Sequence, residues 1–193
     1  FRLQAAYLVM ERVWGPSLHE RCDYTFPEML QIVEQVCEAL EHMHSRGYVH
    51  GDLKPDNILV TGKVRVKLID FGFSSRVGTR LRSMVKGTWG YLAPEQAGGV
   101  LVPETDVYNL GGTMYWMFTG EMLPSIMPDG KGGGFLPTDV RLMTPPIRLN
   151  PDIPSELSDL ILQCCEVRPE DRPALQVVRS IVHDTALRFE LLV

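Results

Sequence analysis

The chain has 193 residues, of which 45% are hydrophobic and 22% are charged, and its formal net charge is -5. This composition is typical of a single globular domain that buries a core, and it shows no bias toward disorder. The acidic balance argues against nucleic-acid binding and against a membrane-surface role, because both depend on basic patches. No basic segment followed by an apolar run opens the sequence, so we expect no secretory signal.

The cysteines and histidines do not indicate a metal site. The four cysteines are Cys22, Cys37, Cys164 and Cys165. They have neither metal-site spacing nor the density of a disulfide framework, so we expect reduced thiols in a cytoplasmic protein. Three histidines fall between positions 42 and 50. Positions two apart on a helix point to different sides, so we assign no transition metal.

The first elements are a strand and a long helix. Residues 5–13 predict a strand, which runs into a connector that ends at Gly15-Pro16. Thr25, with Glu28 three residues later, has the capping-box pattern of a helix start. An apolar stripe at helical spacing follows, and Gly47 suits the C-terminal cap.

A hairpin is predicted next. Residues 58–60 and 64–69 are rich in β-branched side chains, and they flank a turn at Thr61-Gly62-Lys63. Pairing of these two runs would bring Asn57 and Asp70 to adjacent positions at the open end of the hairpin.

The second half of the chain predicts three more helices. Residues 106–118 are apolar on every face, which predicts a buried helix, and they are too few for the roughly 20 residues of a membrane span. Asp106 at its start is therefore a buried acid that needs hydrogen-bond donors. Residues 121–151 predict a loop that contains no phosphate-binding glycine motif. Helical spacing returns over residues 155–165 and 173–185, with Pro173 in a first helical turn.

Two neighbouring motifs carry the chemistry. His50-Gly51-Asp52-Leu53-Lys54-Pro55-Asp56-Asn57 and Asp70-Phe71-Gly72 hold an acid, a lysine, an amide and a second acid in one order. Metal-dependent phosphoryl transfer needs an oriented hydroxyl, metal ions on the phosphates and neutralised charge. Asp52 is a candidate proton acceptor, and Lys54 a candidate positive charge beside the phosphate. Asn57 and Asp70 offer oxygen ligands to magnesium.

Three further motifs follow in order: Gly87-Thr88-Trp89-Gly90-Tyr91-Leu92-Ala93-Pro94-Glu95, Thr105-Asp106-Val107-Tyr108 and Pro169-Glu170-Asp171-Arg172-Pro173. Together the five motifs make residues 6–185 resemble a eukaryotic-type (Hanks-type) protein Ser/Thr kinase, with some similarity to the bacterial members. The resemblance implies an α+β, protein-kinase-like fold, mainly the α-helical C-terminal lobe with a short β-hairpin and with the N-terminal lobe largely missing. Residues 1–15 would end that lobe and form the hinge. Residues 16–193 would be the C-terminal lobe, with a catalytic loop at 50–57 and an activation segment at 70–95.

The resemblance also implies cofactors, partners and sites. ATP and Mg²⁺ are the implied cofactors, and proteins with Ser or Thr acceptors the implied substrates, with neither nucleic acid nor a membrane segment. The implied catalytic residues are Asp52, Lys54, Asn57, Asp70 and Thr88. The implied nucleotide-binding residues are Met10, Glu11, Val13, Lys54, Asn57, Leu59 and Asp70, of which Asn57 and Asp70 would hold the metal. Glu95 is expected to pair with Arg172, and Asp106 to anchor the catalytic-loop backbone.

Departures from the family pattern leave alternatives open. Gly51 stands where most protein kinases have an arginine that pairs with an activation-segment phosphate, so we expect no switching by such a phosphate. His50-Gly51-Asp52 also resembles the loop of aminoglycoside and choline phosphotransferases, although the run ending at Glu95 favours a protein substrate. The first lysine is Lys54, so the family's nucleotide-gripping lysine has no counterpart upstream of the catalytic loop in this chain. The chain is then a kinase fragment that is inactive alone, a pseudokinase or binding module, or a small-molecule phosphotransferase.

Overall fold

The computed structural model describes residues 9–79, 90–124, 127–128, 135–136 and 143–190. The helices among them are α1 (Phe26–Ser45), α2 (Pro94–Ala97), α3 (Pro103–Thr119), α4 (Pro146–Leu149), α5 (Ser155–Cys164) and α6 (Leu175–Glu190). The strands are β1 (Tyr48–Val49), β2 (Ile58–Thr61), β3 (Arg65–Leu68), β4 (Ser75–Arg76), β5 (Met127–Pro128) and β6 (Phe135–Leu136). These strands pair antiparallel as β1 with β4, β2 with β3 and β5 with β6.

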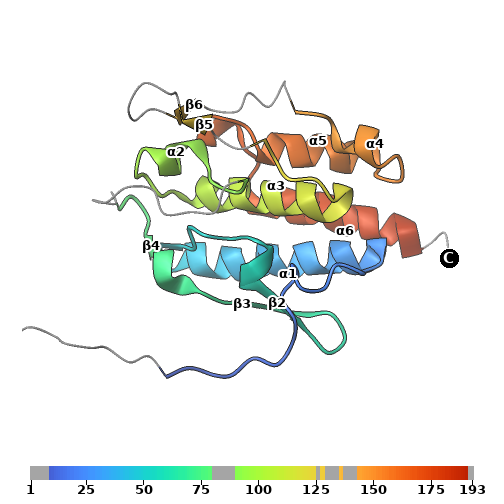
Figure 1. Cartoon of the computed structure of the whole chain (residues 1–193), viewed down its shortest axis with the longest axis horizontal. Coiled ribbons are helices and arrows are strands. Elements are labelled where there is room, and N and C mark those ends of the chain that lie inside the picture. Colours follow the sequence, from blue (N-terminus) through green and yellow to red (C-terminus); the bar gives the residue numbers. More distant parts are fainter. Residues whose placement is uncertain (1–8, 80–89, 125–126, 129–134, 137–142, 191–193) are drawn as a thin grey trace, which may run out of the picture.

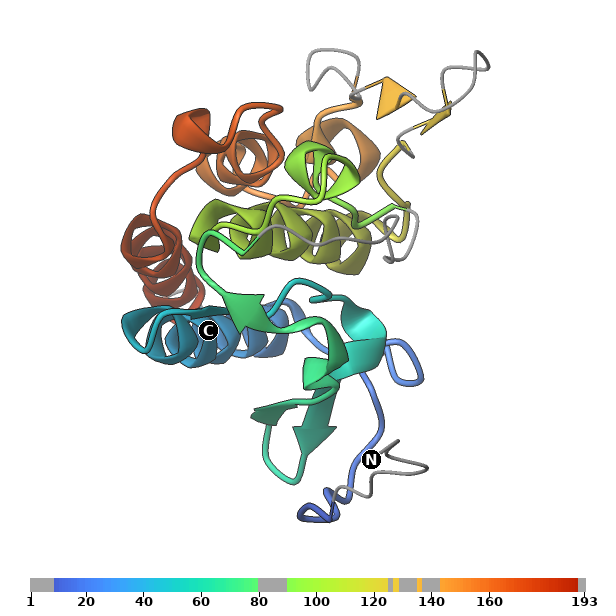
Figure 2. The same ribbon diagram turned by 90° about the vertical axis from the view of Figure 1, so that its left-hand side faces the viewer.

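The longer helices are stacked in layers. Figure 1 shows α1 between the β2–β3 hairpin on one side and α3 on the other, with α5 beyond α3. Helix α6 packs along α1 and also contacts α5. In the turned view the hairpin projects from the helical body on the side where residues 9–20 run (Figure 2). The predicted α+β organisation, with mainly helices and a short hairpin, is present in the described residues.

Helix α1 has the predicted ends. The backbone N–H of Thr25 donates to Glu28 Oε2 over 2.8 Å, and the N–H of Glu28 donates back to Thr25 Oγ1 over 3.4 Å. This reciprocal pair is the capping box that the sequence predicts. After the helix, Gly47 has a φ of +77°, the left-handed conformation that commonly ends a helix.

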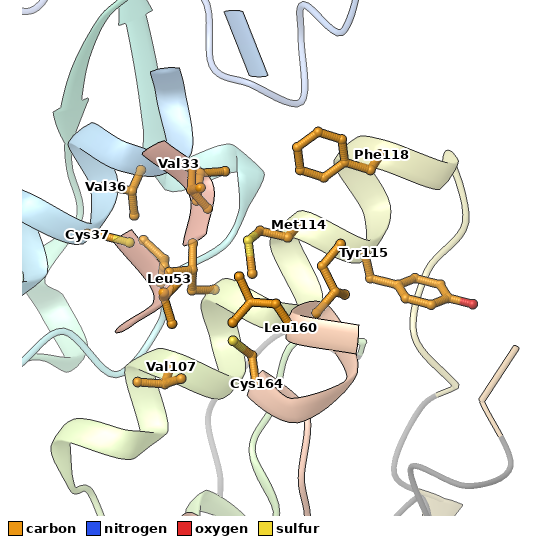
Figure 3. Close-up of a cluster of buried hydrophobic side chains, with 14 of the residues drawn as sticks. Val33, Val36, Cys37, Leu53, Val107, Met114, Tyr115, Phe118, Leu160 and Cys164 are labelled. Atoms are coloured by element: carbon orange, nitrogen blue, oxygen red, sulfur yellow. The ribbon is translucent and has the colours of Figure 1, made fainter. Parts of the chain in front are cut away.

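The core lies between α1, α3 and α5. Figure 3 shows side chains from these three helices meeting around Leu53, which comes from the predicted catalytic loop. The Leu53 side chain is fully buried. Burial of a leucine side chain stabilises a fold by about 1.5–3 kcal/mol, so Leu53 fixes the loop to the helical body.

Helix α3 runs through the centre of this core. It begins at Pro103, three residues before the predicted start, and its residues from Thr105 to Tyr115 are all buried. At Gly111 an added Cβ would lie 2.7 Å from Cβ of Cys164, so the glycine permits the close approach of α5. Across the described part of the chain, no helix combines the length and the apolar character needed to cross a membrane.

Three local predictions are wrong. Residues 9–13 are irregular and form no strand, because no described strand pairs with them, and Val9 is 94% exposed. The predicted loop over residues 121–151 contains the paired strands β5 and β6 and the short helix α4. Pro173 lies before α6, which begins at Leu175, because the backbone stays extended at Arg172 while that side chain reaches a buried site.

Candidate active site

The β2–β3 hairpin brings two of the predicted site residues together. Ile58 is paired with Leu68 in the strand register, and the N–H of Ile69 donates to the Asn57 carbonyl over 3.0 Å. Asn57 therefore ends the turn before β2, and Asp70 follows two residues after β3. The prediction that a hairpin places these two residues at neighbouring positions is confirmed.

Asp52, Lys54 and Asn57 form one polar cluster. Asn57 Nδ2 donates to the Asp52 carbonyl over 2.7 Å and to Asp52 Oδ2 over 3.1 Å. Lys54 Nζ lies 3.7 Å from the same Oδ2. Because the Asn57 nitrogen is engaged with Asp52, the amide oxygen is the atom that Asn57 can offer to a cation.

The surroundings of Asp52 suit a proton acceptor. Its side chain is almost fully buried, and this burial raises the pKa of the carboxyl above its ordinary value. The positive charge of Lys54 and the hydrogen bond from Asn57 act in the opposite direction. A raised carboxylate pKa makes a stronger base, which is the direction that general base catalysis requires.

Asp70 has an unusual backbone. Its φ of 59° and ψ of 71° are left-handed, a conformation that costs a non-glycine residue about 1–2 kcal/mol. One oxygen of its exposed carboxylate accepts the N–H of Gly72 over 3.2 Å. Backbone strain of this kind is often found at functional positions, where the fold holds a side chain in a required direction.

Asp106 anchors the loop that carries Asp52. It has no exposed surface, and its oxygens accept the backbone N–H groups of His50 over 2.9 Å and of Gly51 over 2.8 Å. A third donor is His44, whose Nε2 lies 2.7 Å from Asp106 Oδ2. The predicted role of Asp106 is therefore confirmed. The contact of His44 was not predicted, because its last-turn position on α1 says nothing about a partner 62 residues away.

His50 connects the catalytic loop to the Asp70-Phe71-Gly72 segment. Its ring Nε2 lies 3.2 Å from the carbonyl of Ile69, and its ring centroid is 5.4 Å from that of Phe71. The hydroxyl of Ser74 donates to the His50 carbonyl over 3.3 Å. The pairing of β1 with β4 continues this connection, so the two motifs form one unit.

The predicted nucleotide-binding residues of the hinge do not join the polar cluster. Met10 is 66% exposed, and the carboxylate of Glu11 lies 3.2 Å from Nζ of Lys67 on the surface of β3. Val13 is half-buried beside them. Leu59 is also half-buried and forms a β-bridge with Ser17. Thr88 lies outside the described residues.

The predicted pairing of Glu95 with Arg172 is present. Arg172 Nη1 lies 2.6 Å from Glu95 Oε1, and Nη2 lies 2.8 Å from Oε2. Glu95 also accepts the hydroxyl of Thr105 over 2.8 Å. This pair joins the end of the predicted activation segment to the turn that precedes α6.

Asn57 and Asp70 are chemically suited to hold Mg²⁺. Magnesium prefers oxygen ligands and is usually bound through one or two carboxylates together with phosphate oxygens. Asp70 presents a carboxylate next to the end of the hairpin at which Asn57 presents its amide oxygen. The donor set therefore fits a hard divalent cation.

The comparisons with known proteins agree with this geometry. A family model described as "Protein kinase domain" matches residues 2–184. A probable serine/threonine-protein kinase of Clostridium acetobutylicum is 35% identical over 180 residues, which cover 86% of this chain and 26% of that protein. The serine/threonine-protein kinase PknA of Mycobacterium tuberculosis is 37% identical over 166 residues, which cover 82% of this chain and 37% of PknA. For PrkC of Bacillus subtilis, also a serine/threonine-protein kinase, the identity is 33% over 176 residues, with 86% and 26% covered.

These relatives are similar along most of the chain, and the chain spans about a quarter to a third of their length. The match of the family model includes Asp52, Asn57 and Asp70, the residues that the hairpin and the catalytic loop bring together. The chain belongs to the protein kinase domain family.

Proposed function

We propose that the chain is the substrate-facing part of a protein serine/threonine kinase, which transfers the γ-phosphate of ATP to Ser or Thr hydroxyls of proteins. The observation that carries this proposal is the cluster of Asp52, Lys54 and Asn57, joined by contacts of 2.7–3.7 Å beside Asp70. The names of the bacterial relatives support the same class of reaction.

In this proposal each polar residue has one task. Asp52 orients the acceptor hydroxyl and receives its proton, which its raised pKa favours. Lys54 places a positive charge near the transferred phosphate, and Asn57 and Asp70 hold Mg²⁺. A metal ion held by these two residues would supply positive charge against the phosphate oxygens. Thr88 completes the catalytic set by resemblance to the serine/threonine class.

Met10, Glu11, Val13 and Leu59 are the proposed adenine-facing residues. Residues 1–15 would form the hinge and the end of the N-terminal lobe, and residues 16–193 the C-terminal lobe. Two exposed apolar side chains support a further covering element, since Met10 is 66% exposed and Phe71 is 51% exposed. We therefore propose that the working kinase has a further lobe, that it acts in the cytoplasm, and that this chain is inactive alone.

The test compares residues 1–193 with the intact parent protein. We expect negligible phosphate transfer from ATP to a protein substrate by the chain alone, and robust transfer by the parent. In the parent, Asp52→Asn should lower kcat by about 10²–10⁴-fold while ATP affinity changes little, because only the base is lost. Asp70→Asn should weaken Mg²⁺-dependent nucleotide binding. Asp56→Asn is the matched control, because Asp56 is exposed in the same turn.

Each outcome separates the candidate functions. Robust autophosphorylation by residues 1–193 would contradict the inactive fragment, and full activity of Asp52→Asn would contradict the proposed base. Nucleotide binding without transfer by the parent would support a pseudokinase. Transfer to choline or an aminoglycoside, with none to protein, would support a small-molecule phosphotransferase, the alternative that Gly51 suggests.

A further inference from the structure

Gln96 occupies a buried position between the catalytic loop and the segment before α2. Its side chain is on the first turn of α2, and the residue is 5% exposed. Its Oε1 accepts two hydrogen bonds, from the N–H of Ala93 over 2.9 Å and from Asn109 Nδ2 over 3.0 Å. Its Nε2 donates to the carbonyl of Gly51 over 2.7 Å. The amide of Gln96 therefore bonds at both ends.

These three bonds join three separate parts of the fold. Gly51 directly precedes Asp52, the proposed base. Ala93 belongs to the run that leads to Glu95, and Asn109 lies in the buried middle of α3. Asn109 Nδ2 also donates to the carbonyl of Tyr91, so the same network holds the described end of the activation segment at a second point.

Gly51 has no side chain that could make this connection, and its surroundings are tight. Its φ is +76°, and an added Cβ would lie 3.3 Å from the Phe73 carbonyl oxygen and 3.3 Å from Cδ1 of Leu101. Leu101 is itself buried. The connection between the catalytic loop and the activation segment is instead made by the Gly51 carbonyl, through Gln96.

We infer that Gln96 is a positioning residue that keeps Asp52 in a fixed position relative to the activation segment. It does so without a phosphate group on that segment. The effect on catalysis rests on the proposed function. The three hydrogen bonds of the Gln96 side chain, which we call the clamp, are a property of the fold. Both atoms of the Gln96 amide are used, so the site requires one acceptor and one donor. Glutamate has the same shape, but when ionised it presents an oxygen to the Gly51 carbonyl and donates nothing.

The first experiment tests the clamp without any assay of activity. Hydrogen exchange of residues 1–193 is compared between the wild type, Gln96→Glu and Gln31→Glu, a control on the exposed face of α1. We expect Gln96→Glu to exchange about tenfold faster near neutral pH in peptides that cover residues 50–57 and 91–97, since a buried acceptor loses its donor. Gln31→Glu should match the wild type. Unchanged exchange over residues 50–57 in Gln96→Glu would overturn the inference.

The second experiment measures catalysis in the intact parent. We expect Gln96→Glu to lower kcat by about tenfold near pH 8 while the KM for ATP stays within about twofold, because the clamp acts on the base and not on the nucleotide. Toward about pH 6 the activity relative to wild type should rise, because a protonated glutamate can again donate to the Gly51 carbonyl. Gln96→Leu cannot regain a donor and should stay low at both pH values. Gln96→Leu places no titratable group at position 96, so its profile shows how much of the pH dependence comes from other groups such as the nearby Asp52.

A pH-independent loss that is equal in Gln96→Glu and Gln96→Leu would contradict the positioning role. A wild-type parent that transfers no phosphate would contradict the proposed function instead. In that case the exchange comparison still decides whether Gln96 clamps the loop.

Discussion

Arg172 and Glu95 form a buried, two-pronged ion pair with contacts of 2.6 and 2.8 Å, in which the arginine side chain has no exposed surface. The remaining guanidinium N–H groups donate to the carbonyls of Glu104, Glu166 and Val167. All five N–H donors of the arginine are thereby used, which is the condition under which a buried charge is tolerated.

Removal of the arginine should be strongly destabilising. Arg172→Leu leaves the Glu95 carboxylate buried without its charge partner, and we expect a loss of about 3–5 kcal/mol in the free energy of unfolding. Arg179→Leu is the control, because Arg179 is partly exposed and pairs with Glu38 and Glu41 on the surface. Its loss should be within about 1 kcal/mol. Urea unfolding measures both, and equal losses would contradict a special role for the buried pair.

Asp106→Asn should release the catalytic loop. The amide keeps one acceptor oxygen, but its NH₂ group would meet a hydrogen-bond donor and could not accept from it. The donors to Asp106 are the backbone N–H groups of His50 and Gly51 and the His44 ring. We expect about 1–3 kcal/mol less stability, the cost of leaving a buried donor unpaired, and faster amide exchange at Gly51. Asp159→Asn, on an exposed position of α5, should change neither quantity. A variant with wild-type stability and unchanged Gly51 exchange would show that the loop does not depend on this acid.

Periodic patterns and local motifs predicted the parts of this fold that are determined locally. Thr25 and Glu28 predicted the start of α1 because a capping box involves residues only three apart. The hairpin between Asn57 and Asp70 was predicted for a similar reason, since a short turn fixes the pairing of its strands. The roles of Asp106 and Arg172 came from family resemblance, and the structure confirms their contacts.

Other contacts had no local signal. Gln96 bonds to Gly51 across 45 positions and His44 to Asp106 across 62, and polar residues at such separations carry no mark of their partners. The strand predicted over residues 5–13 fails at residues 9–13 for a related reason. A strand is stabilised by a neighbouring strand, and local apolar alternation does not supply one.

Gly51→Ala tests the crowding around the catalytic loop, with Gly47→Ala as a matched control. The two glycines have nearly the same φ, +76° and +77°, but an added Cβ has no neighbour within 4 Å at Gly47. Each substitution should cost about 1–2 kcal/mol for the left-handed backbone. Gly51→Ala should cost more, because its Cβ meets the Phe73 carbonyl and Leu101. Equal losses in chemical unfolding would mean that these neighbours yield without strain.

Asp52→Asn should stabilise the protein at neutral pH even though it removes the proposed base. Burial raises the pKa of Asp52 above its ordinary value of 3.8, so ionisation costs the folded state more than the unfolded state. This cost is absent at pH values below the pKa of Asp52 in the unfolded state. It is fully present at pH values above its pKa in the folded state. The variant should therefore have the higher Tm near neutral pH, by about 2–4 °C for each 1 kcal/mol, and lose this advantage below about pH 4. A lower Tm of Asp52→Asn at neutral pH would mean that Lys54 and Asn57 outweigh the effect of burial.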